Sequence, residues 1–340
     1  MRFTTASVAL SLFAVQATAH HSEAGIDMQN VLSFDATVTE YSWRNPHVYF
    51  TAETVDDAGA SVEWTLQMGS TITSTRTGWS SDSLTPGDRV TIHVHPAMDG
   101  RSYGILESVD LAGGGAVVSG VARYEVEDQE LSATSLEGKW MADPAKLVRY
   151  PGGFDGFFRA QLQPTEAGRA AMESYNTLSD DNPDSTCVPR PTPALIVSSN
   201  LYPIEIVINE ADETILLRTE SFDEERVVYL DGRSHPPVDD RTAAGHSIGR
   251  WEGDVLVIDT ANFADNRSPY QIGVPGGAQR HVVERYELID GGRRVRADFT
   301  LEDPEYLAEP LTHSRELLYS PHLPTMRFDC DPNVTRRFVP

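Results

Sequence analysis

The sequence predicts an all-β protein built from two barrel-like units. Short clusters of Val, Ile and Tyr recur along the 340 residues, separated by 21 Pro and 25 Gly that are spread through the chain. Hydrophobic residues make up 40% of the chain and charged residues 23%. This composition is typical of many short strands joined by turns, in a chain long enough for about two domains. The same composition argues against a helical bundle.

The first nineteen residues have the pattern of a signal peptide. Arg2 supplies a positive start, an apolar stretch follows from Val8 to Val15, and Ala17-Thr18-Ala19 offers the small residues of a cleavage site. No later segment reaches the roughly 20 apolar residues that a membrane-spanning helix needs. We therefore expect a periplasmic or secreted protein that is not inserted in a membrane.

The chain has two cysteines, Cys187 and Cys330. In an oxidising compartment a lone pair of this kind usually forms one disulfide. A metal or redox role would normally show CxxC spacing, which this pair lacks. We therefore expect a structural disulfide that closes a long loop.

The region 20–112 is expected to form a small OB-like barrel. Five strand-like segments alternate with turns, and the stretch between the third and fourth, from Ser70 to Trp79, is long enough for a short helix. The expected strands are 38–41, 47–50, 62–66, 89–94 and 105–109. A glycine run and an acidic stretch then predict a linker over 113–135.

The region 136–340 is expected to form an antiparallel meander barrel of lipocalin type with a ligand-sized interior, and a sandwich is the alternative. Its one expected helix spans Pro164–Tyr175, with proline at the first position where its missing N–H costs nothing. Closing the meander into a barrel removes exposed strand edges. The expected strands are 204–208, 214–217, 227–230, 247–251, 255–259, 281–288, 295–301 and 313–319.

Several motifs resemble an uncharacterised family of bacterial exported proteins. They are His20-His21-Ser22, Trp43-Arg44-Asn45-Pro46-His47, Gly78-Trp79 and the Pro86-Gly87-Asp88 turn. The resemblance covers roughly residues 20–112. The segment Gly245–Asp254, which contains Trp-Glu-Gly-Asp, resembles exported hypothetical proteins of the same kind. The resemblance implies export and a two-part design, and it implies no activity.

Histidines of the first region suggest a copper site. Cleavage after Ala19 would leave His20 as the first residue, whose free amine and ring nitrogen can chelate copper together with His21 and His47. Surface histidines near a terminus are also common, so an ordinary solvated terminus remains the alternative.

The expected strand 281–288 places Val282, Glu284, Tyr286 and Leu288 on its more apolar face, so Glu284 is expected to point inward. An inward carboxyl group either pairs with an arginine or has its pKa raised, and a raised pKa suits a general base. Both interpretations remain open, and Tyr286 is expected beside it as a ligand contact.

The segment around Asp231-Gly232 reads as a turn, and it places Arg233 and His235 at a strand end, where a barrel mouth would meet an anionic or carbonyl-bearing ligand. His246 and Arg250 fall on one strand face, and Asp259 is a weaker candidate for an inward carboxylate.

Three functions are therefore open. The first is an exported protein that binds a small apolar or amphipathic ligand in the second barrel, with Arg233, Arg250, Asp259 and Tyr286 as contacts. The second is an acid–base enzyme of lyase or isomerase type that uses Glu284, His246 and His235. The third is a copper-binding protein.

The chain has 51 Asp and Glu against 27 Lys and Arg, a net charge of −24. This charge argues against nucleic acid as a partner, because binding phosphates requires basic residues that replace counterions. The sequence indicates no particular protein partner.

Overall fold

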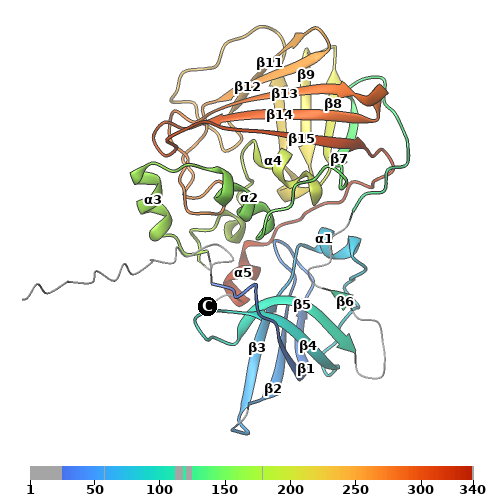
Figure 1. Ribbon diagram of the computed structural model, residues 1–340, viewed down its shortest axis with the longest axis vertical. Helices are drawn as coiled ribbons and strands as arrows, with labels where there is room; N and C mark the ends of the chain where they lie inside the picture. The colour runs from blue at the N-terminus through green and yellow to red at the C-terminus, as the bar shows by residue number, and fades with distance from the viewer. Residues whose placement is uncertain (1–24, 57, 112–117, 120–124, 178, 339–340) are drawn as a thin grey trace, which may run out of the picture.

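The computed structural model describes residues 25–56, 58–111, 118–119, 125–177 and 179–338, and these form two closed β-barrels (Figure 1). The predicted all-β, two-unit architecture is confirmed. The expected signal peptide lies outside the described residues. No described helix is both long and apolar enough to cross a membrane.

The N-terminal barrel has the strand arrangement of an OB fold. Its sheet order is β3-β2-β1-β4-β5-β6, and a parallel pairing between β3 and β5 closes it. Helix α1 lies between β3 and β4, where the sequence predicted a helix, and it begins where the Ser70 hydroxyl accepts a hydrogen bond from Thr73 N, 3.2 Å away. Strand β6 falls inside the region expected to be a linker. The elements are β1 Leu32–Ser42, β2 Tyr49–Val55, β3 Ser61–Gln67, α1 Thr71–Arg76, β4 Arg89–Pro96, β5 Tyr103–Leu111 and β6 Val118–Ser119.

The C-terminal barrel closes in the order β10-β11-β12-β13-β14-β15-β7-β8-β9. Its neighbouring strands are antiparallel except β10 and β11, which pair in parallel, so the meander is interrupted once. The strands are β7 Gly138–Ala142, β8 Ile204–Asn209, β9 Thr214–Thr219, β10 Glu225–Tyr229, β11 His246–Glu252, β12 Val255–Ala261, β13 His281–Ile289, β14 Arg294–Glu302 and β15 Leu311–Tyr319.

The second part of the chain contains more helix than the single segment expected. That segment is observed as α3, Glu166–Glu173, capped by the Thr165 hydroxyl, which accepts from Gly168 N. The apolar residues of the other helices lack a long amphipathic repeat, which is why the sequence did not reveal them. They are α2 Gly153–Gln161, α4 Ala194–Val197 and α5 Pro332–Phe338, with single 3₁₀ turns at 183–186, 198–200, 221–223 and 290–292.

Side chains fill the interior of the C-terminal barrel. Alternate residues of its strands point inward and are buried with the apolar side chains of α2 and α4 in one core cluster. Helix α4 is buried along its whole length, and inward-pointing Arg315 donates hydrogen bonds to the carbonyl oxygens of Ile196 and Val197 at the end of this helix. Burial lowers the pKa of Arg315 to about 10. The barrel is thus plugged by part of its own chain, so the prediction of a ligand-sized interior was wrong.

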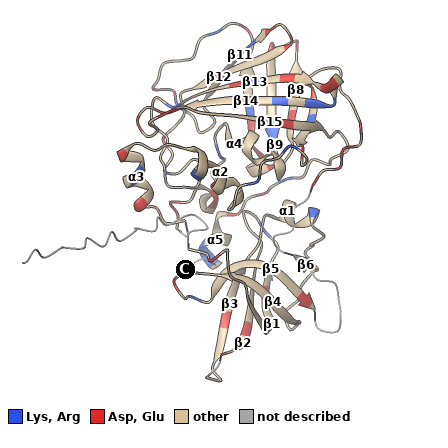
Figure 2. Cartoon of the chain, viewed as in Figure 1, with Lys and Arg blue, Asp and Glu red and all other residues tan. Residues whose placement is uncertain are grey.

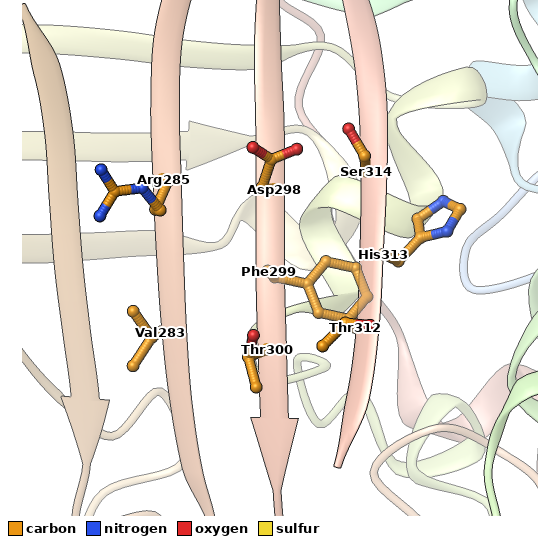
Figure 3. Close-up of a pocket in the computed structure, with 8 residues that line it drawn as sticks. All are labelled: Val283, Arg285, Asp298, Phe299, Thr300, Thr312, His313 and Ser314. Atoms are coloured by element: carbon orange, nitrogen blue, oxygen red, sulfur yellow. The ribbon is translucent and has the colours of Figure 1, made fainter.

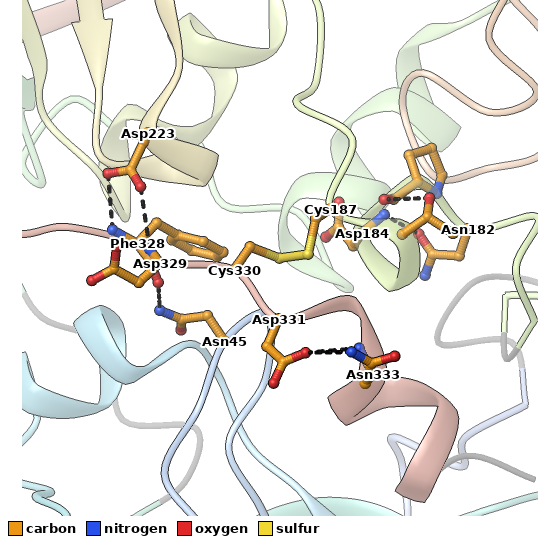
Figure 4. The surroundings of a disulfide bond; sticks show 12 residues. Asn45, Asn182, Asp184, Cys187, Asp223, Phe328, Asp329, Cys330, Asp331 and Asn333 are labelled. Atoms are coloured by element: carbon orange, nitrogen blue, oxygen red, sulfur yellow. Dashed lines mark hydrogen bonds between the residues drawn. A yellow bond between two sulfur atoms is a disulfide. The ribbon is translucent and has the colours of Figure 1, made fainter.

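The C-terminal segment, residues 320–338, joins the two barrels. Cys330 forms the expected disulfide with Cys187, 143 residues earlier in the chain (Figure 4). The Asn45 amide accepts a hydrogen bond from Thr71 N at 2.8 Å and donates one to the carbonyl oxygen of Phe328. Helix α5 then packs its apolar residues, with Phe338 stacked on Tyr49, against the N-terminal barrel. The Asn-Pro-His motif is therefore where the N-terminal barrel receives the end of the chain.

Candidate acid–base site

Four titratable side chains gather on the outer wall of the C-terminal barrel. Ser247, Thr260 and Val282 are buried and point inward, so their neighbours in the sequence point outward. These outward residues are His246 on β11, Asp259 on β12 and His281 on β13. His235 reaches them from the loop between β10 and β11. We call His235, His246, Asp259 and His281 the imidazole cluster.

Asp259 is the centre of the cluster. Its Oδ1 lies 3.0 Å from His235 Nε2 and 2.8 Å from His281 Nε2. The other ring nitrogen of His235, Nδ1, lies 2.9 Å from Nδ1 of His246. At the opposite end of the cluster from His246, Nδ1 of His281 lies 3.6 Å from a carboxylate oxygen of Glu302 on β14. The result is a continuous chain of proton-binding groups from His246 to Glu302.

The hydrogen bonds assign protons along this chain. Because a carboxylate only accepts, His235 and His281 both donate their Nε2–H to Asp259. A neutral His235 then accepts at Nδ1, which makes His246 the donor through its own Nδ1–H. Nε2 of His246 consequently carries the lone pair, and no described residue forms a hydrogen bond with it. This nitrogen is the one that can take a proton from a bound molecule.

The environments of the two end histidines shift their pKa values in opposite directions. Partial burial, followed by the neighbouring charges of His235 and Arg233, lowers the pKa of His246. The hydrogen bond to Asp259 raises the pKa of His281, and the same bond lowers the pKa of Asp259. Relative to an ordinary histidine, these shifts favour the neutral form of His246 and the charged form of His281, which is the division of roles expected of a base and an acid.

Tyr229 and Arg233 complete the surroundings of His246. The Tyr229 ring stacks on the His246 ring with centroids 5.3 Å apart. The guanidinium of Arg233 lies over the Tyr229 ring, 3.8 Å from its centroid, and it is paired with Asp231 at 2.5 Å. The stack fixes the plane of His246 and places a cation beside it.

A depression of about 490 Å³ in the outer wall adjoins the imidazole cluster (Figure 3). Two rows of outward side chains cross β13, β14 and β15 here: Arg285, Asp298 and Ser314 form one, and Val283, Thr300 and Thr312 the other. Phe299 and His313 lie beneath them. Val283 is paired in register with Asp259, and it lies two residues, or about 7 Å, along β13 from His281. The depression and the cluster are therefore parts of one surface, with polar and apolar groups side by side.

Glu284 and Tyr286 lie inside the barrel, on the opposite side of the sheet from the histidines. Glu284 is fully buried, and its two carboxylate oxygens lie 2.9 and 2.8 Å from NH2 of Arg226. The same guanidinium donates to Ser247 and Thr260 through NH1, and the Tyr286 hydroxyl donates to Glu284 over 3.0 Å. Glu284 was expected either to pair with an arginine or to have a raised pKa, and the structure shows the pairing, with Arg226.

Two further candidates are placed differently from the sequence prediction. Asp259 was expected to point inward and instead points outward, because Leu256, Ile258 and Thr260 take the inward positions of β12. Arg250 shares the outer face with His246, as expected, but its guanidinium is paired with Glu252 at 2.6 Å. Arg250 is therefore committed to a surface ion pair.

The described residues do not bring together a set of ligands for copper. His20 and His21 lie outside them. His47 is packed between the barrels, where burial lowers its pKa, and its Nδ1 has no hydrogen-bond partner among the described residues. In the part of the chain that the structure describes, no group of three or more His, Cys, Asp or Glu side chains is arranged to hold a metal.

The sequence reasoning did not single out His281, Glu302 or Tyr229. The available signal was the strand alternation itself, because His281 falls on the opposite face of its strand from Glu284 and thus on the same face of the sheet as the other histidines. The prediction considered only the apolar face of strand 281–288 and therefore did not include His281.

One comparison with known proteins finds a match. A family of unknown function, DUF6152, matches residues 8–107, which cover most of the N-terminal barrel. No curated protein matches the chain. This match is consistent with the expected resemblance of the first part of the chain to an uncharacterised family. The match does not extend to the C-terminal barrel, where the candidate site lies.

Proposed function

We propose that the outer wall of the C-terminal barrel is an acid–base catalytic site. The observation that carries this proposal is the position of Asp259, whose single Oδ1 accepts hydrogen bonds from His235 at 3.0 Å and from His281 at 2.8 Å. His235 in turn connects this oxygen to His246. In this proposal His246 is the general base, His235 and Asp259 orient it, and His281 is the general acid.

The chain of hydrogen bonds supports proton abstraction at His246. When Nε2 of His246 takes a proton, the positive charge is shared through Nδ1–H with His235 and stabilised by the Asp259 carboxylate. A base with a pKa near the working pH contributes about 10²- to 10⁴-fold to the rate. His281, whose charged form is favoured by Asp259 and Glu302, is then the group that returns a proton to the product.

The adjacent depression suggests the substrate class. Its volume of about 490 Å³ lies within the range of roughly 300 to 1,000 Å³ of small-molecule sites. Val283 offers apolar contact, and Arg285, which is also paired with Glu252 at 2.9 Å, offers positive charge for a carboxylate or carbonyl oxygen. We infer a small amphipathic carbon acid, whose proton lies next to a carbonyl or carboxylate, and a reaction of lyase or isomerase type.

Deuterium exchange tests the proposal without knowledge of the product. A panel of small 2-oxo and 3-hydroxy carboxylates is incubated with the protein in D₂O, and loss of the proton next to the carbonyl is followed by NMR. We expect exchange of at least one compound, and a rate about 10²- to 10⁴-fold lower with His246→Gln. His322→Gln changes an exposed histidine outside the cluster and should leave the rate unchanged. No exchange with any compound, or equal rates with His246→Gln, would overturn the assignment.

Binding without turnover is the second candidate function. It is favoured by the mixed lining of the depression, where Val283 lies beside a polar row of Arg285, Asp298 and Ser314. A protein that only binds an amphipathic molecule there would show chemical-shift changes at Thr300 and Thr312 with a panel compound, and no exchange of its proton.

We further infer that the protein works outside the cytoplasm. The pattern of residues 1–19 and the disulfide between Cys187 and Cys330 support this proposal. N-terminal sequencing of the protein from its own host tests it: a mature chain that begins at His20 is expected, and retention of Met1 in the purified protein would contradict export by cleavage.

A further inference from the structure

A second depression lies on the other strands of the C-terminal barrel, between the outer wall at β7–β10 and the C-terminal segment. Its volume is about 600 Å³. A row of alternating charges crosses the wall here: Lys139, Glu205, Arg218 and Glu225, each paired in register with the next. Figure 2 shows acidic and basic residues interspersed over this barrel. The opposite side of the groove is made by Thr325, Met326 and Arg327.

The charged side chains that line this groove have partners, with one exception. Lys139 donates to the Leu323 carbonyl oxygen at 2.7 Å, and Arg218 is paired with Glu225 at 2.9 Å and with Glu205 at 4.0 Å. At the floor, Glu220 pairs with Arg76 at 2.6 Å and accepts from Met326 N. Asp223 accepts from the backbone of the C-terminal segment, and Arg327 lies 3.4 Å from it.

Glu224 is the exception. Its residue is 8% exposed, it lines the groove, and its carboxylate has no hydrogen bond or ion pair with a described residue. The charges that act on it are those of Arg226, two residues further along the chain on β10, Glu284 on β13 and Arg190. Arg226 is already paired with Glu284, and Arg190 with Asp184. One buried carboxylate is thus left without a countercharge.

A buried carboxylate in this position either holds a proton or faces a cation from outside. Burial, only partly offset by Arg226, raises the pKa of Glu224 to about 7. The carboxylate is therefore about half protonated at neutral pH, and a cation that enters the groove can displace that proton.

We propose that this groove binds a small organic cation, of the alkylguanidinium or alkylammonium class, whose charge is held by the Glu224 carboxylate. The groove is large enough for such a molecule, and Pro203 and Met326 supply apolar contact for its alkyl part. A bare divalent metal does not fit, because metal sites use several free carboxylates and this groove offers one. The site is separate from the imidazole cluster and does not depend on it.

Calorimetry with butylguanidinium tests the proposal, with butylurea as an uncharged molecule of similar shape. We expect the wild-type protein to bind butylguanidinium and not butylurea. In buffers of different ionisation enthalpy, binding should release about half a proton at pH 7, nearly one at pH 6 and almost none at pH 8, because the cation replaces the proton on Glu224.

Two variants make the test specific. Glu224→Gln should weaken butylguanidinium binding at least tenfold, whereas Glu287→Gln, which changes a carboxylate outside the groove that is paired with Arg296, should change it less than twofold. The measurements on the wild-type protein stand even where a variant folds poorly. Equal affinity for butylurea, absence of proton release, or full binding by a folded Glu224→Gln protein would overturn the proposal.

Discussion

Replacing Arg226 by methionine should destabilise the C-terminal barrel severely. Arg226 and Glu284 are 2% and 0% exposed, and their charged atoms are 2.8 Å apart, so the substitution leaves a fully buried carboxylate without its partner. Breaking a buried pair in this way costs about 3 to 5 kcal/mol. Ser247 and Thr260 also lose the donor that each accepts from. We expect the loss at the upper end of that range.

Urea denaturation followed by tryptophan fluorescence and circular dichroism measures this loss. For a domain of this size a dependence of about 3 kcal/mol per M urea applies, so a loss of 3 to 5 kcal/mol moves the midpoint by roughly 1 to 1.7 M. Arg250→Met makes the same change in a surface pair, in which the Arg250 side chain is 60% exposed and lies 2.6 Å from Glu252. That control should lose less than about 1 kcal/mol.

A double variant separates the two explanations of the loss. If the cost comes from an uncompensated charge, Arg226→Met combined with Glu284→Met recovers most of the stability, because no buried charge remains. The reasoning would be refuted if the urea midpoint of Arg226→Met stayed within about 0.3 M of the wild-type midpoint, which is the largest shift expected of the Arg250→Met control. So would a double variant that is as unstable as the single one.

Three further predictions concern the cluster, the disulfide and the Asn-Pro-His motif. Asp259→Asn removes the charge that raises the pKa of His281, so its NMR titration midpoint should fall. In the wild type, the raised pKa of His281 means that its pairing with Asp259 stabilises the fold fully below about pH 6.5. This stabilisation is lost as the pH rises through the pKa of His281 in the folded state. Denaturation of the wild type and of Asp259→Asn at several pH values checks this dependence. Replacing Cys187 and Cys330 by alanine should cost up to about 5 kcal/mol, because the bond closes a loop of 143 residues, and the thermal midpoint measures it. Asn45→Ala should cost about 1 to 3 kcal/mol, because it leaves Thr71 N and the buried Phe328 carbonyl without a partner. Faster hydrogen exchange of the C-terminal segment would reveal this loss, and unchanged exchange would contradict that role.

The sequence predicted the fold where local pattern and tertiary structure agree. The five strands of the N-terminal barrel and the helix after the third were visible as apolar alternation interrupted by turn residues. Two features had no local signal. Strand β6 has two residues, and it exists because β5 offers it a free edge. Helix α4 has four residues and is fully buried, so packing inside the barrel rather than helix propensity stabilises it.

The site was predicted in part for the same reason. The sequence predicted that Glu284, His246 and His235 would lie together in the barrel. The structure brings His235 and His246 together, with Nδ1 atoms 2.9 Å apart, but it places Glu284 on the opposite face of the sheet. The alternation of strand 281–288 correctly placed Glu284 inside, yet it could not show that Arg226, 58 residues away, would meet it there. The direction of Asp259 was wrong because Val255 and Val257, its apolar companions, lie on the outer face of the barrel.

The position of the candidate site follows from how a nine-stranded barrel is filled. Barrels of about eight strands leave an interior just wide enough for side chains. Here α4 and the Arg226–Glu284 pair occupy that space, and the two charges of this pair are already matched to each other. Groups that remain available to a small molecule must then lie on the outward residues of the strands. The imidazole cluster has that placement: side-chain exposures of 23% for His235, 32% for Asp259 and 33% for His281 leave these groups shielded enough to interact strongly and open enough to exchange protons. The chemistry of this protein should therefore be sought on the outside of its second barrel.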